Sequence, residues 1–338
     1  MPFDMRKQAL LIIFSTSLTL NVHSQDGKQY FVDAFKEQMD MLQGKRPIDF
    51  KRAVFITENA YYKGQLNYQT YCNDISAICI KLQNLIKQRG FEKYKTGGNW
   101  ATFFYMKDSS AINGFKPYIY DFDDYMGDKD YTKQFITKLM RTHTGNCHSL
   151  PFLYKILCDE IGTRASLAMA PNHVYIKHID ENGKWTNVEL TSGGFPRDQW
   201  IIESMSISVE AIKSGAYMAP LSDKENIALT MDDLADSYNF QFGVDKFLLD
   251  MIDTAINYYP TCIPLYELKN NCCIELVKKE RKKPQPDMVF IYRNRALGLA
   301  AQAKFYELGY KDESPEAYKA FLQGMEDEKR KRGIVKNN

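Results

Sequence analysis

Apolar residues recur at helical spacing in two segments of the first third of the chain. The first runs from Tyr30 to Leu42 and the second from Ile75 to Gly90, where the glycine is typical of a helix end. The second segment carries a continuous apolar stripe made of Ile75, Ile78, Cys79, Leu82, Leu85 and Ile86. Both segments are therefore predicted to be helices with one face in a hydrophobic core.

The pattern changes between Thr96 and Gly127. Gly97-Gly98, Asn113-Gly114 and Pro117 interrupt this segment, and an aromatic run extends from Trp100 to Tyr105. Glycine and proline at such positions are typical of turns, and aromatic residues favour strands. The segment is predicted to consist of loops and a short strand.

A helix followed by strands is predicted in the middle of the chain. Helical spacing begins near Cys147 and runs to Ile161, and Gly162 follows as a typical C-terminal cap. The pattern then indicates three strands, which are Ala165 to Ala170, His173 to Ile179 and Trp185 to Thr191. The residues Asp180 to Gly183 between the last two strands are typical of a hairpin turn.

Helical spacing returns after Pro220. The pattern predicts helices at Lys246 to Tyr259, Pro264 to Lys279, Met288 to Leu308 and Ser314 to Arg332. Ala255 followed by Pro260 has the spacing seen at the close of a tetratricopeptide repeat, but no second repeat stands in register with it. These helices are interpreted either as packing on the neighbouring domain or as presenting a surface for a protein partner. We expect an α+β fold with a core in residues 25–220 and a helical region in residues 221–338.

The first residues of the chain resemble an export signal. Arg6 and Lys7 precede an uncharged apolar run from Ala9 to Leu20, and cleavage is predicted after Ser24. The apolar run is shorter than the roughly 20 residues that a membrane helix needs, and no later stretch is long enough either. The protein is thus predicted to be exported, to the periplasm, the cell surface or the medium, without a stable membrane span.

Composition excludes several classes of function. The 44 Lys and Arg nearly balance the 42 Asp and Glu, so the chain lacks the basic field that drives nucleic-acid binding. The seven cysteines include no Cys-x-x-Cys pair and no Cys/His cluster with zinc spacing, and a calcium loop counted from Asp121 has Met126 where glycine is needed. No metal and no cofactor are predicted. Seven is an odd number, so at least one thiol is expected to be free, and Cys147 is the candidate.

Cys147 is also the candidate nucleophile. It stands where a helix follows a long loop, and Pro151 is tolerated there because a first-turn residue has no intrahelical partner for its N–H. Backbone N–H groups and the helix dipole favour an anion at this position, so we expect a stabilised thiolate and one part of an oxyanion hole. Taken alone, this cysteine can also be interpreted as a small buried apolar residue.

His173 is the candidate base, because it opens a strand 26 residues after Cys147. His143 and His148 stand too close to Cys147 in sequence to face it from a strand, and His178 points to the opposite side of the strand from His173. The third role, holding the imidazole in orientation, needs an acceptor on the next strand. Glu189 fits this position across the hairpin, and Asn187 on the same strand is the alternative orienting residue.

This order of residues resembles the transglutaminase-like superfamily, a relative of the papain-type thiol enzymes. The resemblance covers roughly residues 130–195, and its most specific part is Gly145-Asn146-Cys147 with Leu153-Tyr154 behind it. It implies a papain/transglutaminase-like core in which a nucleophile helix packs on an antiparallel sheet, with Cys147, His173 and Glu189 as the catalytic residues. The family usually has aspartate at the position of Glu189. A core followed by helices also resembles the bacterial branch with a helical, tetratricopeptide-like C-terminal region.

Two functions from different classes follow. The first is a thiol-dependent hydrolase or acyltransferase that acts on peptide or protein amides, with hydrolysis favoured because nothing identifies an amine site. The second is a catalytically silent, transglutaminase-like binding protein that uses the C-terminal helices to contact a partner.

Overall fold

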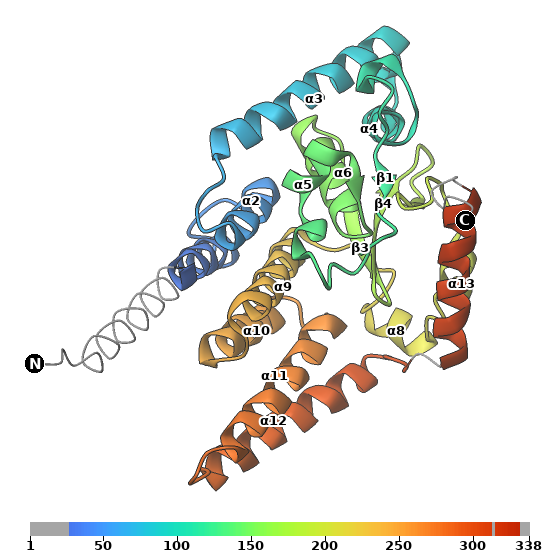
Figure 1. Cartoon of the computed structure of the whole chain (residues 1–338). Coiled ribbons are helices and arrows are strands. Elements are labelled where there is room, and N and C mark those ends of the chain that lie inside the picture. Colours follow the sequence, from blue (N-terminus) through green and yellow to red (C-terminus); the bar gives the residue numbers. More distant parts are fainter. Residues whose placement is uncertain (1–26, 313–314, 332–338) are drawn as a thin grey trace, which may run out of the picture.

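The computed structural model describes residues 27–312 and 315–331, and the fold is α+β with many helices and two small sheets (Figure 1). The predicted export signal lies outside the described residues. No helix in the described ranges has the length and apolar character that a membrane crossing requires.

The larger sheet has three antiparallel strands, in the order β3, β4, β5. They are Ser166–Ala170, His173–Ile179 and Trp185–Val188. The predicted hairpin turn is present, since the Asp180 carboxylate accepts hydrogen bonds from the backbone N–H groups of Asn182 and Lys184, both at 2.8 Å. The smaller sheet pairs β1 (Ile119–Tyr120) with β2 (Thr144–Gly145) in parallel.

Helix α6 (Ser149–Glu160) lies against the three-stranded sheet and forms the centre of the core. Ten of its residues, Ser149 to Cys158, are buried, and it contacts β3, β4, α4 (Gly97–Lys107) and α5 (Ile136–Thr142). Pro151 falls in the first turn, as the sequence predicted. After Ile161 the chain turns at Gly162, whose φ of +74° is favourable for glycine.

The prediction of loops and a strand for residues 96–127 is wrong for the aromatic run in its first part. The aromatic run lies in helix α4 (Gly97–Lys107), and the one strand in this region is β1. Packing explains the difference, because a Cβ on Gly98 would lie 1.9 Å from the hydroxyl oxygen of Thr163. The glycine that suggested a loop is needed instead for a close approach between α4 and the residues after α6.

Two long helices escaped prediction. Helix α2 (Phe50–Tyr61) contains the β-branched residues Val54, Ile56 and Thr57, which weaken its helical signal. Helix α9 (Asp223–Phe242) has acidic residues on its buried side, which breaks the apolar stripe. Its start is nevertheless marked in the sequence, since Ser222 and Glu225 form a reciprocal capping box.

Most of the remaining helices lie close to their predicted limits or are short, but α3 begins seven residues before the predicted start at Ile75. A helix covers residues 27–42, and α3 spans Tyr68–Arg89 with Gly90 as its left-handed cap. The short helices are η1 (Phe91–Lys93), η2 (Ala111–Asn113), η3 (Tyr131–Gln134), α7 (Asp198–Ser204) and α8 (Val209–Ser214). The C-terminal helices are α10 (Lys246–Tyr258), α11 (Ile263–Arg281), α12 (Met288–Glu307) and α13 (Pro315–Lys331).

The hydrophobic core is continuous across residue 220. Helix α9 packs on α2 and α10, and α11 packs along α12. A buried polar contact accompanies the first of these interfaces, since the Gln38 amide donates to the hydroxyls of Thr57 at 2.9 Å and Thr230 at 3.2 Å. The first C-terminal helix after Pro220 therefore packs directly on helix α2 from the N-terminal part of the chain.

Candidate active site

Cys147 is the middle of the three residues between β2 and α6, and its side chain is partly exposed. The helix begins at Ser149, two residues after the thiol. Asn146 holds the turn, since its side-chain oxygen accepts hydrogen bonds from the backbone N–H groups of His148 at 3.1 Å and Ser149 at 3.0 Å. Asn146 also donates to the Gln134 side chain at 2.8 Å. The residue before the thiol therefore fixes where the helix starts.

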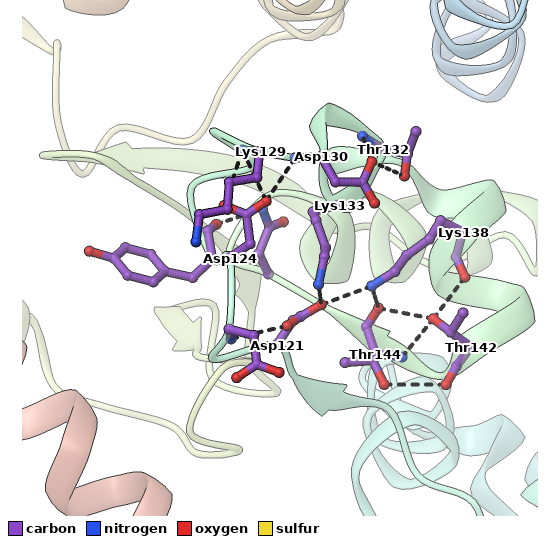
Figure 2. A network of polar contacts seen from close by, with 12 residues as sticks. Asp121, Asp124, Lys129, Asp130, Thr132, Lys133, Lys138, Thr142 and Thr144 are labelled. Carbon is purple, nitrogen blue, oxygen red and sulfur yellow. Dashed lines mark hydrogen bonds and ion pairs between the residues drawn. The ribbon is translucent and has the colours of Figure 1, made fainter.

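A buried ion cluster holds the β1–β2 pair, and β2 leads into the turn that contains Cys147 (Figure 2). The Asp121 carboxylate accepts from Lys133 Nζ at 2.5 Å and Lys138 Nζ at 3.0 Å, and Lys138 Nζ also donates to the Thr144 carbonyl at 2.7 Å. Burial acts to raise the pKa of Asp121, but the hydrogen bonds from both lysines outweigh it and lower the pKa. The cluster thus keeps an ionised carboxylate between α5, η3 and the β1–β2 pair.

The rest of this acidic stretch is a structured loop. The Asp124 carboxylate accepts hydrogen bonds from the backbone N–H groups of Asp128, Lys129 and Asp130 (Figure 2). These bonds turn the loop back on itself and satisfy the oxygens that a cation would need. Within the described ranges, no group of three or more His, Cys, Asp and Glu side chains is arranged to hold a metal ion.

His173 opens β4 and lies beside the thiol. Its Nε2 is 2.6 Å from Glu189 Oε2, and the imidazole lies near enough to Cys147 for this residue to raise its pKa. Because Nε2 is engaged by the carboxylate, Nδ1 is the ring nitrogen available to the sulfur. The structure thus brings together the three residues Cys147, His173 and Glu189, which come from a turn, a strand and the end of the next strand.

His173 and Glu189 each stabilise the charged form of the other. Burial alone would lower the pKa of His173, but the Glu189 carboxylate and the hydrogen bonds with Cys147 and Glu189 raise it to about 10. Burial would raise the pKa of Glu189, but the His173 charge and the hydrogen bonds from His173 and Thr191 lower it. An imidazolium next to an ionised carboxylate is therefore the stable form at neutral pH.

Thr191 is a residue of this site that the sequence analysis missed. The second carboxylate oxygen of Glu189 accepts from the Thr191 N–H at 2.8 Å and from its hydroxyl at 2.7 Å. Glu189 also pairs with Gly194 through two backbone hydrogen bonds, so the loop between them closes tightly. The Glu-x-Thr spacing is the sequence signal for this contact, because a side chain that accepts from the residue two positions on is a common turn motif.

Asn187 does not take the orienting position. It pairs with Lys177 in the sheet, and its amide nitrogen donates to the Pro196 carbonyl at 3.0 Å and to Asp198 at 2.7 Å. The structure assigns it to the turn before α7, while Glu189 alone contacts His173 from this strand.

His148, next to the thiol in sequence, belongs to a different contact. Its Nε2 is 2.8 Å from Asp233 Oδ1 on α9, and its Nδ1 is 3.0 Å from the Gln134 carbonyl oxygen. The ring also packs on Phe152, with 3.9 Å between ring centroids. Burial opposes protonation here, but the charge and hydrogen bond of Asp233 raise the pKa of His148. This pair joins the start of α6 to the C-terminal helices.

No model of a protein family matches this chain, and neither a curated protein nor a solved structure matches it. The chemistry of the site therefore has to be derived from its own geometry.

Proposed function

We propose that the protein is a thiol-dependent amide hydrolase or acyltransferase with Cys147 as nucleophile, His173 as acid and base, and Glu189 as the orienting carboxylate. The observation that supports this most directly is the position of the His173 imidazole. It bonds Glu189 at 2.6 Å, and the Cys147 sulfur contacts the carbonyl oxygen of Asn172, the residue directly before His173. A nucleophile, a base and a group that orients the base form the general arrangement for activating a weak nucleophile.

The reaction follows from the charges of the site. His173 already carries the proton, so the sulfur attacks the carbonyl carbon of an amide as the thiolate partner of the imidazolium. A C–S bond forms and the carbonyl electrons move to oxygen. The tetrahedral intermediate collapses, and the departing amine takes the proton from the imidazolium. Water or a second amine then attacks the thioester, and His173 accepts and returns the proton. Glu189 stabilises the imidazolium in each cycle.

A papain/transglutaminase-like core is part of this proposal. Helix α6 packs against β3 and β4, with the thiol before the helix and the imidazole at the start of a strand. This arrangement supports that part of the proposal. Peptide or protein amides are the proposed substrates, and the signal-like residues 1–24 support the proposal that the protein acts after export.

The rate of thiol alkylation tests the proposal. The folded protein is treated with iodoacetamide across a pH series, and the modification of each cysteine is followed by peptide mass spectrometry. Cys147 is expected to react rapidly even at mildly acidic pH, because the imidazolium favours the thiolate. Cys72, which is also partly exposed, is an internal control. If Cys147 reacts no faster than Cys72, the proposed nucleophile is not activated and the function is rejected.

A second candidate is a binding protein that uses the C-terminal helices. Helix α12 supports it, because Val289, Tyr292 and Leu299 are exposed large apolar residues on this helix. A Cys147→Ala protein that keeps its full biological effect favours this candidate over the enzyme. Loss of that effect, with an unchanged melting temperature, favours the enzyme.

A further inference from the structure

Tyr120 is a polar residue near the thiol that the proposed mechanism has not used. It ends β1 and stands opposite Gly145 in the parallel pair, two residues before Cys147. The backbone N–H of Asp121 donates to the Gly145 carbonyl at 2.7 Å, so the two chain segments are joined at this point. Tyr120 is therefore carried on the segment that is hydrogen-bonded to the chain leading into the nucleophile.

The side chain of Tyr120 is directed toward the site. Neighbouring residues of an extended segment point to opposite sides, and Asp121 points to Lys133 and Lys138. The Tyr120 ring is largely buried and packs edge to face on Phe122, with 4.9 Å between centroids. Its position is thus set by packing and by backbone pairing.

The hydroxyl of Tyr120 has no assigned partner. Among the described residues no hydrogen bond from this hydroxyl is found, yet it is not sealed in the core, as the unpartnered hydroxyls of Tyr175 and Tyr259 are. Burial, followed by the charges of Cys147, Tyr125 and Glu189, raises its pKa, so those groups are near enough to act on it and the hydroxyl keeps its proton. A protonated hydroxyl beside a nucleophile is a donor available to a reacting atom.

We propose that the Tyr120 hydroxyl and the Cys147 backbone N–H together donate to the carbonyl oxygen of the substrate as it becomes an oxyanion. The Cys147 N–H is available, since it donates to no residue of the described chain and Asn146 already holds the N–H groups of His148 and Ser149. The inference rests on the proposed function, because it assigns the second donor for the same tetrahedral intermediate. It makes Tyr120 a catalytic residue that touches the substrate.

Two electrophiles that react with the Cys147 sulfur distinguish donation to an oxyanion from a general effect on the reactivity of the thiol. p-Nitrophenyl acetate acylates a thiolate through a tetrahedral oxyanion and expels p-nitrophenolate. Iodoacetamide alkylates the same thiolate by displacing iodide from carbon, and no oxyanion forms. Tyr120→Phe is expected to slow the release of p-nitrophenolate about 100-fold, the effect of removing one oxyanion donor. Alkylation of Cys147 by iodoacetamide is expected to change less than about 3-fold.

A neighbouring tyrosine provides the matched control. Tyr118→Phe removes a hydroxyl from the same segment, but Tyr118 stacks on His143, with 4.4 Å between centroids, and its polar neighbour is Tyr105. Both reactions are expected to stay at the native rate in this variant. A further protein, with Tyr120 alone replaced by 3,5-difluorotyrosine, keeps the ring and strengthens the donor, and acylation is expected to become faster while alkylation does not.

The outcomes are distinct. If Tyr120→Phe acylates at the native rate, or if acylation and alkylation fall by the same factor, Tyr120 is not an oxyanion donor and the inference fails while the proposed function stands. An unchanged acylation rate in the difluorotyrosine protein also contradicts the inference, and this test does not depend on how well Tyr120→Phe folds. If the native chain is not acylated at Cys147 at all, the proposed function fails and the inference with it.

Discussion

The Cys147 sulfur contacts the backbone carbonyl of Asn172, the residue before His173, with an Sγ to oxygen distance of 3.8 Å. Asn172 has a φ of +52°, in the left-handed region that few residues other than glycine and asparagine adopt easily. The tight turn between β3 and β4 therefore aims both a carbonyl and an imidazole at the thiol.

This backbone conformation gives the first prediction. Asn172→Ala is expected to lower the free energy of unfolding by about 1 kcal/mol, because alanine resists a positive φ, whereas Asn172→Gly should cost little at this position. Urea unfolding of both variants measures the difference. Equal loss of stability in the alanine and glycine variants would show that the side chain of Asn172, and not its φ, is what the turn requires.

The orienting carboxylate gives the second prediction. Glu189→Gln removes the charge that, against the effect of burial, raises the pKa of His173, so the imidazolium should lose its proton at lower pH. Alkylation of Cys147 at mildly acidic pH is expected to slow about 10-fold or more, because less thiolate is paired with an imidazolium. The rate is followed with iodoacetamide across the pH series.

Glu189→Asp is the matched variant for this prediction. It keeps the charge and shortens the reach by one methylene, and the resemblance to the transglutaminase-like superfamily implies that aspartate can fill this role. Its alkylation rate is expected to lie between those of the native protein and Glu189→Gln. A Glu189→Gln protein with a native pH profile would show that His173 does not depend on this carboxylate.

The three strands could be predicted because hydrophobic alternation and the Asp180 to Gly183 turn are local signals. The helix at the aromatic run could not, because Gly98 suggested a loop while its actual role is a close approach to Thr163, which lies 65 residues away in sequence. Helix α9 was missed because its buried face carries an acid, Asp232, beside half-buried Asp233, and only their tertiary surroundings accommodate them.

The site also contains residues that local sequence patterns predict and residues that only the tertiary structure brings there. The spacing of Cys147, His173 and Glu189 along a helix and a hairpin is visible in the sequence. Tyr120 reaches this place through a parallel strand pairing that no local pattern encodes.

The third prediction concerns the ion cluster in front of the nucleophile. Asp121→Asn removes the charge that pairs with buried Lys138 and half-buried Lys133, and breaking such a cluster typically costs about 3–5 kcal/mol. The free energy of unfolding is expected to fall by about this amount. Alkylation of Cys147 should also slow, because Lys138 no longer holds β2 through both Asp121 and the Thr144 carbonyl.

Asp128→Asn tests whether any charge in this loop has the same effect. Asp128 is exposed, and its change is expected to alter stability by less than about 0.5 kcal/mol. A comparable loss in both variants would indicate a general effect of loop charge and would remove the special role of Asp121.

The last prediction concerns Glu58, a buried carboxyl near the His148 and Asp233 pair. A small cavity lined by Glu58, His148 and Asp233 among others lies between α2, α6 and α9. Burial raises the pKa of Glu58 from 4.5 to about 7, although the backbone N–H groups of Ile136 and Thr137 donate to it. A group whose pKa is higher in the folded state stabilises the fold below its unfolded value, and this contribution is lost as pH rises through the folded value.

The native protein should therefore lose stability between pH 4.5 and about 7 as Glu58 is forced to ionise in the core. Glu58→Gln keeps an acceptor for one of the two N–H groups, which bond separate carboxylate oxygens in the native protein. It cannot ionise, so its free energy of unfolding should depend less on pH in this window, by on the order of 1–3 kcal/mol. Urea unfolding at several pH values measures both slopes, with the exposed Glu92→Gln as control. Parallel slopes for the native protein and Glu58→Gln would mean that Glu58 ionises at its ordinary pH, and that water reaches its carboxylate through the cavity.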